Sequence, residues 1–136
     1  MRKVTVIIEK GIDFYSAYIP DDIKSVFLNG QGKTISGAIE DLKTALEEAI
    51  ETYVGEGSPL PEDLSKDLKF EFKYDIASLF DHFDEINISS FARKNGINES
   101  LLRKYRNRLA FASERQRKKI ESGLHRLGKS LIEATI

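Results

Sequence analysis

The chain contains no cysteine and no tryptophan, and it has only three prolines and two histidines among 136 residues. The absence of cysteine excludes a disulfide framework and a thiolate metal site, and it fits a reducing compartment. Long apolar runs are missing as well. The stretch from Val4 to Ile8 is broken by Glu9 and is shorter than a signal-peptide core or a membrane span requires. We therefore expect a soluble cytoplasmic protein without a membrane partner.

Patterns that carry catalysis or bind metals are weak. The segment Gly32-Lys33-Thr34 resembles the end of a phosphate-binding loop, but that motif requires glycine where this chain has Phe27. The acidic and histidine-containing run at residues 81–85 would scatter its side chains around a helix, which favours a solvated surface over a metal site. No nucleophile has a suitable base nearby in the sequence. We predict a protein that is not an enzyme and that has no catalytic residues, metal or cofactor.

Acidic and basic residues are segregated along the chain. Twelve of the 21 Lys and Arg residues follow Ile86, together with four carboxylates, whereas nine bases and 18 acids precede it. A formal total of −1 therefore combines about −9 in the first part with about +8 in the second. Such an asymmetry indicates two partners of opposite charge, and a basic helical segment is first of all a candidate for nucleic-acid binding. The alternative is a solvated charged face on each half.

Three short strands are predicted at the start of the chain. Residues 3–10 are rich in Val, Ile and Thr, and residues 14–19 form a second short run, so the pair predicts a β-hairpin. Residues 25–28 predict a third strand that ends at the glycine-containing turn 29–32.

A long amphipathic helix follows, with Thr34 as its expected N-cap and an apolar 3.6-residue period that continues to Tyr53. Residues 68–74 then alternate apolar and charged side chains, as an amphipathic strand does. The first half therefore reads as a β-β-β-α-β domain over residues 1–74. The polar face of the helix carries five acids: Glu40, Asp41, Glu47, Glu48 and Glu51.

The second half, residues 75–136, is helical in pattern throughout and predicts a domain of four helices. The first contains apolar residues at i, i+3, i+4 and i+7 from Ile76. Further helices are expected over 89–95, over 99–109 and from Glu114 onward. Ser113 and Gln116 form a capping box at the start of the last helix.

Residues 87–108 have the spacing of a helix-turn-helix motif. The motif needs a small residue where its helices cross, which Ala92 supplies, and a residue that tolerates positive φ at the turn, which Gly96 supplies. Ile97 closes the turn, and the second helix returns apolar residues to the core. These are Leu102 and Tyr105. The alternative is a basic helical hairpin that packs on a protein.

The second helix of such a motif enters the major groove of DNA. Asn98 and Ser100 lie at its N-terminal end, and Arg103 lies one turn later, where it can reach guanine, so we predict that these residues read bases. Asn107 lies on the same outward surface. Many members of the class place a phosphate-binding glutamine where this chain has Ile88. Phosphate contacts are instead predicted for four bases: Arg93, Lys104, Arg106 and Arg108.

The first half resembles the HicB antitoxin family. That family has a strand ending in Tyr-x-Ala-x-[VIL]-Pro-Asp, then a short strand, a turn with glycine and a long acidic helix. Here the strand end is YSAYIPD at residues 15–21, and the helix is residues 34–53. The family usually continues with a Leu-Pro-Gly-Cys type of turn, whereas this chain has DIKS at residues 22–25. The second half resembles the helix-turn-helix of one HicB branch, through residues 100–105 and 112–114.

The resemblance implies a partial RNase H-like fold without nuclease activity, followed by a helix-turn-helix domain. It also implies a small basic ribonuclease toxin of the HicA type as partner, whose RNA-binding face the five acids of the helix would help to cover. As a homodimer or higher homo-oligomer, the protein would read two half-sites of operator DNA and repress its own operon. Two alternatives are a stand-alone transcriptional regulator whose first domain dimerises or senses a ligand, and a nuclease, for which the first strand offers only Glu9.

Overall fold

The computed structural model describes residues 1–64 and 67–136, and the chain divides into two compact units, Met1–Ser78 and Leu79–Ile136. The division lies within helix α2 (Ile76–His82), slightly after the boundary predicted at residue 74. The first turn of this helix therefore groups with the strands that precede it. Each unit has its own buried core, and each is described separately below.

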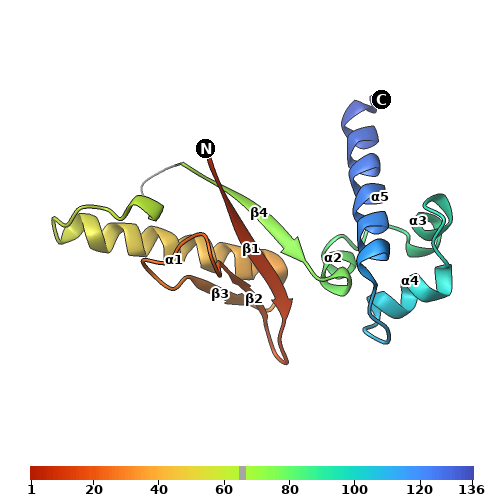
Figure 1. Ribbon diagram of the computed structural model, residues 1–136, viewed down its shortest axis with the longest axis horizontal. Helices are drawn as coiled ribbons and strands as arrows, with labels where there is room; N and C mark the ends of the chain where they lie inside the picture. Colours follow the sequence, from red (N-terminus) through yellow and green to blue (C-terminus); the bar gives the residue numbers. More distant parts are fainter. Residues whose placement is uncertain (65–66) are drawn as a thin grey trace. The chain divides into compact units, whose positions relative to one another are not determined.

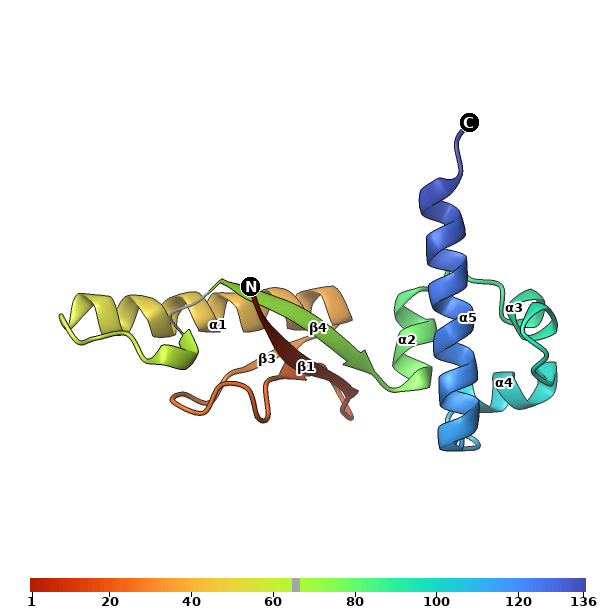
Figure 2. The same ribbon diagram turned by 45° about the horizontal axis from the view of Figure 1, so that its top comes forward.

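The first unit is a small mixed sheet with one long helix on one face (Figures 1 and 2). The strands run in the order β3-β2-β1-β4, in which β1 pairs antiparallel with β2 and parallel with β4. The predicted β-β-β-α-β order is thus confirmed, and the fold class is α+β. The elements are β1 (Arg2–Lys10), β2 (Tyr15–Tyr18), β3 (Asn29–Gly32), α1 (Ile35–Gly55), the short 3₁₀ helix η1 (Glu62–Leu64) and β4 (Leu68–Tyr74).

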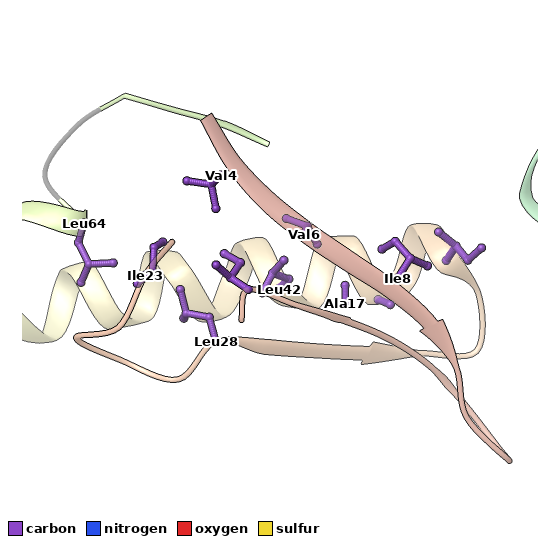
Figure 3. Packing of buried hydrophobic residues seen from close by; sticks show 11 residues of the cluster. Val4, Val6, Ile8, Ala17, Ile23, Leu28, Leu42 and Leu64 are labelled. Atoms are coloured by element: carbon purple, nitrogen blue, oxygen red, sulfur yellow. The ribbon is translucent and has the colours of Figure 1, made fainter. Parts of the chain in front are cut away.

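The core of the first unit lies between the sheet and α1. Val4, Val6 and Ile8 occupy alternate positions of β1 and are fully buried or nearly so, because side chains alternate between the two faces of a strand. They belong to the same buried core as Leu42 of α1, which has no exposed surface (Figure 3). Burial of each such aliphatic side chain contributes about 1.5–3 kcal/mol. The opposite face of the sheet carries mainly polar side chains.

The third strand lies four residues later than predicted. Residues 25–28 form bends and irregular structure, and β3 consists of the Asn-Gly-Gln-Gly segment that we had predicted as a turn. This segment is a strand because it pairs antiparallel with β2, with Gly30 opposite Ala17, and its glycines are required by the close approach of α1. A Cβ atom on Gly30 would lie 2.2 Å from the carbonyl oxygen of Ala38, and one on Gly32 would lie 2.6 Å from the Ala38 nitrogen. Only glycine lets the helix backbone lie this close to the strand.

The second unit is all helical and contains the end of α2 together with α3 (Ile88–Lys94), α4 (Glu99–Arg106) and α5 (Glu114–Glu133). Helices α3 and α4 lie beside the N-terminal half of α5, whose C-terminal half extends past them (Figure 2). The core contains Phe80 and Phe91, whose rings meet edge to face at 5.7 Å, and the fully buried Ala92 and Leu102.

Helix α4 was predicted to reach Leu109 but ends at Arg106. Arg108 has a left-handed φ of 60°, and the Leu109 N–H donates to the Lys104 carbonyl across 2.9 Å. The Arg108 N–H donates to the Tyr105 carbonyl, which completes a Schellman motif. The sequence does not show where α4 ends, because the residue in the left-handed conformation after it is Arg108 and not the glycine that usually marks such an ending.

Candidate functional site

The turn between α3 and α4 has the geometry that the helix-turn-helix spacing requires. Gly96 has a φ of +64°, and the Ile97 N–H donates across 2.8 Å to the carbonyl of Ala92, which is fully buried. A glycine is needed here because other residues enter the left-handed region at a cost of about 1 kcal/mol or more. Leu102 and Tyr105 of α4 are buried beneath the pair of helices. The outer residues of α4 therefore face solvent.

Two asparagines begin the helices of this segment. The Asn87 side chain accepts from the Ser90 N–H at the start of α3, and the Asn98 side chain accepts from the Leu101 N–H across 2.9 Å at the start of α4. An asparagine that reads adenine uses both its carbonyl oxygen and its amide group. The Asn98 oxygen already accepts the capping hydrogen bond, so this residue has a structural role at the start of α4, and base reading by Asn98 stays a prediction.

Arg103 is positioned by the preceding helix. Its Nη1 atom donates to the Oγ atom of Ser89 across 3.0 Å, while the side chain remains exposed. Ser89 lies in the first turn of α3, fourteen residues earlier in the chain. Sequence reasoning did not single out Ser89, because no local pattern pairs the two positions.

Two of the four predicted phosphate contacts already have acidic partners. Arg93 forms an ion pair with Glu99 in the first turn of α4 and donates a second hydrogen bond to Ser90. The guanidinium of Arg108 lies 3.9 Å from the Asp81 carboxylate. These pairs weaken the case for Arg93 and Arg108 as direct phosphate ligands. Four other predicted DNA-binding residues are exposed on or next to α4: Ser100, Lys104, Arg106 and Asn107.

Two basic side chains of helix α5 form hydrogen bonds with the turn between α3 and α4. The Lys119 ammonium group donates to the Gly96 carbonyl across 2.7 Å, and Arg126 donates to Asn95 Oδ1 across 2.8 Å. Gly123 lies between these two bases and makes room for the Asn95 side chain. These two cations thus have a structural role, which the sequence did not reveal because their partners lie 23 and 31 residues away.

The charge segregation follows the division into units. The first unit contains fifteen acidic and nine basic residues, a formal charge of −6, and the second contains seven acidic and twelve basic residues, a formal charge of +5. Both values are smaller than those of the two parts that meet at Ile86, because three acids at positions 81–85 belong to the second unit. Each unit still has a clear sign.

The five acids of α1 are exposed on the side of the helix opposite Leu42. They span about a third of the helix circumference at 100° per residue, so they form one acidic face. Asp41 has an additional role, since its Oδ2 atom accepts the Gln31 N–H of β3 across 2.9 Å. This makes Asp41 partly structural, whereas the four glutamates of the acidic face are exposed without such a bond to β3.

A second polar cluster stabilises the loop before β3. Asp63 of η1 accepts from the Ser25 hydroxyl across 2.5 Å and from the backbone N–H groups of Lys24 and Ser25. These hydrogen bonds lower the pKa of Asp63 below its usual value. The bond from the Ser25 hydroxyl has the largest effect. The backbone carbonyl of Asp63 also accepts from Arg2. The residues of this cluster are separate from the acidic face of α1. Their hydrogen bonds connect η1 to the loop before β3.

No protein-family model matches this chain, and no curated protein or solved structure matches it. Within residues 1–64 and 67–136, no helix is both long enough and apolar enough to cross a membrane. The same residues contain no group of three or more His, Asp or Glu side chains arranged to hold a metal ion.

Proposed function

We propose that the chain is a HicB-type antitoxin. In this proposal the first unit neutralises a small basic ribonuclease toxin of the HicA type, and the second unit binds operator DNA and represses the operon. The observation that carries the proposal is the coincidence of charge and structure, a unit of formal charge −6 followed by a unit of +5. The partial RNase H-like fold is part of the same proposal, and the β-β-β-α-β order with one helix on a mixed sheet supports it.

The DNA-binding half of the proposal is supported by α3, α4 and the turn between them. Exposed Ser100 and Arg103 would face base edges in the major groove, where a guanidinium can bind guanine O6 and N7 together. Lys104 and Arg106 would contact phosphates and set the position of α4 along the groove. A dimer would place two copies of α4 in successive major grooves, roughly 34 Å apart, and would therefore read a palindromic operator.

The toxin-binding half is supported by the acidic face of α1. A basic ribonuclease must present cations to its RNA substrate, and a protein surface of opposite charge that covers them competes with RNA for the same groups. Complementary potentials also raise the rate of encounter and disfavour other partners. A two-metal nuclease needs several carboxylates that converge from its strands, and β1 supplies only Glu9, whose carboxylate accepts a hydrogen bond from the Tyr18 hydroxyl across 3.0 Å.

The DNA half is tested by selecting duplexes that bind the full-length protein from a random pool and measuring affinity by fluorescence anisotropy. Lys104→Ala with Arg106→Ala should weaken binding at least tenfold, whereas Lys10→Ala, which removes an exposed cation from the first unit, should leave it unchanged. Failure of the unaltered protein to bind duplex DNA in low salt would reject this half.

The toxin half is tested by searching beside the gene for a short reading frame of basic composition and by co-expressing its product with this chain. Co-expression should yield a stable complex and relieve growth arrest, and the triple variant Glu40→Lys, Glu47→Lys, Glu51→Lys should lose both effects. A matched control reverses three acids outside α1: Asp13→Lys, Glu62→Lys and Glu85→Lys. If the neighbouring protein neither binds nor inhibits growth, the antitoxin role is rejected.

A stand-alone regulator whose first unit dimerises is the second candidate. The outer edge of β4 favours it, because none of the strands that the structure describes pairs there. If the protein binds DNA and its first unit binds only other copies of itself, the result supports a stand-alone regulator and not an antitoxin.

A further inference from the structure

Strand β4 ends the sheet on one side. It pairs with β1 without interruption from Leu68 to Tyr74, and among the described residues no strand pairs with its other edge. It is seven residues long and contains neither proline nor glycine. Such an edge presents a regular row of N–H and C=O groups to any strand that can approach it.

The sequence of this edge alternates in charge as well as in polarity. Residues 67–73 read Asp-Leu-Lys-Phe-Glu-Phe-Lys. Leu68, Phe70 and Phe72 are half-buried against the core of the first unit, while Lys69, Glu71 and Lys73 lie on the exposed face. With the exposed Asp67 directly before the strand, the charges are negative, positive, negative and positive in order. Read backwards, the same segment gives the opposite sign at every charged position.

We propose that β4 pairs antiparallel with β4 of a second copy of this chain, about a two-fold axis at Phe70. In this register Lys69 faces Glu71 of the second copy, and Asp67 faces Lys73 of the second copy. The symmetry repeats both pairs, so four opposite-charge pairs form. Phe70 faces its own copy, and Leu68 faces Phe72 of the second copy on the side of the sheet that α1 covers.

The charges select this register over its neighbours. An axis at Glu71 would place that carboxylate opposite itself and Lys69 opposite Lys73, so that every charged pair would repel. An axis at Phe72 would pair residues 70–74, the same number of β4 residues as the 68–72 of the proposed register, but its outer charged pair would require Asp75, which caps the start of α2 by accepting the Ser78 N–H. Lysines on an edge strand usually prevent association. Here each lysine has an acid two residues away, so a reversed copy of the strand accepts both lysines.

The apolar side of the strand supports the same occupant. Phe70 and Phe72 are only half-buried, and their rings lie 6.3 Å apart in an edge arrangement. A second copy would place its own Phe70 against Phe70 and its Leu68 against Phe72, since directly opposed residues approach within about 4.5–5.5 Å between Cβ atoms. Because the contact is isologous, it closes on itself as a dimer.

A cross-linking experiment tests the register in the full-length protein, which has no native cysteine. Phe70→Cys should form a disulfide-linked dimer under mild oxidation, because position 70 faces itself. Phe72→Cys is the matched control, since it changes the same residue type on the same face but places the two sulfurs about four residues apart along the strands, roughly 13 Å. Cross-linking of Phe72→Cys in place of Phe70→Cys would overturn the register, and a monomeric parent protein with neither cross-link would overturn the pairing.

Charge reversal tests the pairing without altering the core. By sedimentation equilibrium, Lys69→Glu should weaken dimerisation roughly tenfold or more, because two attractive pairs become repulsive. Adding Glu71→Lys to that variant should restore the dimer, and Lys24→Glu should leave it unchanged. A dimer that is equally stable in Lys69→Glu would overturn the proposal. These measurements do not involve DNA or a toxin, so their failure is separate from a failure of the proposed function.

Discussion

The guanidinium of Arg103 on α4 donates a hydrogen bond to the hydroxyl of Ser89 on α3 across 3.0 Å. This bond gives the exposed arginine a defined direction before any ligand arrives. A side chain that is already oriented loses less conformational entropy when it meets a base edge. The contact also makes Ser89 a positioning residue for Arg103.

Replacement of Arg103 should reduce sequence preference more than affinity for DNA in general. Arg103→Ala is expected to cost about 1–3 kcal/mol on a selected duplex and much less on random duplex, because a base contact is lost. Lys104→Ala should weaken binding to both and lower the salt slope by about 0.9 for the lost phosphate contact. Anisotropy titrations over a range of salt concentrations measure both effects. Equal losses on both duplexes for Arg103→Ala would contradict base reading.

Two glycines of α5 should respond in opposite ways to alanine. A Cβ atom on Gly123 would lie 2.4 Å from Asn95 Oδ1, and Asn95 is held by its bonds with Phe91 and Arg126. Gly123→Ala should therefore destabilise the second unit by about 1–3 kcal/mol. Gly128→Ala is the matched control: nothing lies within 4 Å of its Cβ position, so the higher helix propensity of alanine should add about 0.5–1 kcal/mol. Thermal unfolding followed by circular dichroism distinguishes them.

The approach of α1 to β3 predicts a larger effect in the first unit. Gly30→Ala would place a methyl group 2.2 Å from the Ala38 carbonyl oxygen and 2.3 Å from the Leu42 nitrogen, which are backbone atoms that cannot move independently. We expect destabilisation of about 3 kcal/mol or more. Gly55→Ala, at the end of α1 in open space, should be neutral or slightly stabilising. Urea unfolding of both variants checks this, and a Gly30→Ala protein as stable as the parent would exclude the close packing.

The cluster at Asp63 predicts a dependence of stability on pH. Its hydrogen bonds lower the pKa of this carboxyl in the folded state, so the ionised form stabilises the fold. That contribution is fully present above the ordinary carboxyl pKa, near pH 4, and is lost as pH falls through the lower folded value. Asp63→Asn should therefore be less stable than the parent at pH 7, and the difference should shrink toward pH 3. A difference that stays constant with pH would assign the effect to packing.

Periodicity was enough to predict most of the first unit. The apolar alternation of β1 and β4 and the 3.6-residue repeat of α1 are properties of neighbouring residues, so they can be read directly. The position of β3 could not be predicted in this way, because an Asn-Gly-Gln-Gly segment has the composition of a turn. It is a strand because it pairs with β2, where Gly30 lies opposite Ala17, and this pairing joins residues that are far apart in the sequence.

In the candidate DNA-binding surface, too, the features set by neighbouring residues could be predicted, and those set by distant residues could not. Ala92, Gly96 and Ile97 are fixed by spacing within one motif, and the structure places them as that spacing requires. The cap role of Asn98 was also local and could have been recognised, since asparagine before a helix is a common N-cap. In contrast, the hydrogen bond from Lys119 to the Gly96 carbonyl depends on how α5 packs, which no short pattern encodes.

Asp41 reaches from α1 to the outer side of β3 and takes the Gln31 N–H, where an additional strand would otherwise bond. β3 is also only four residues long and half glycine. The two borders of the sheet are therefore unequal, since a carboxylate of its own helix bonds to one, whereas no strand among residues 1–64 and 67–136 pairs with the other. Association through β4 consequently stops at two copies and does not continue into a filament.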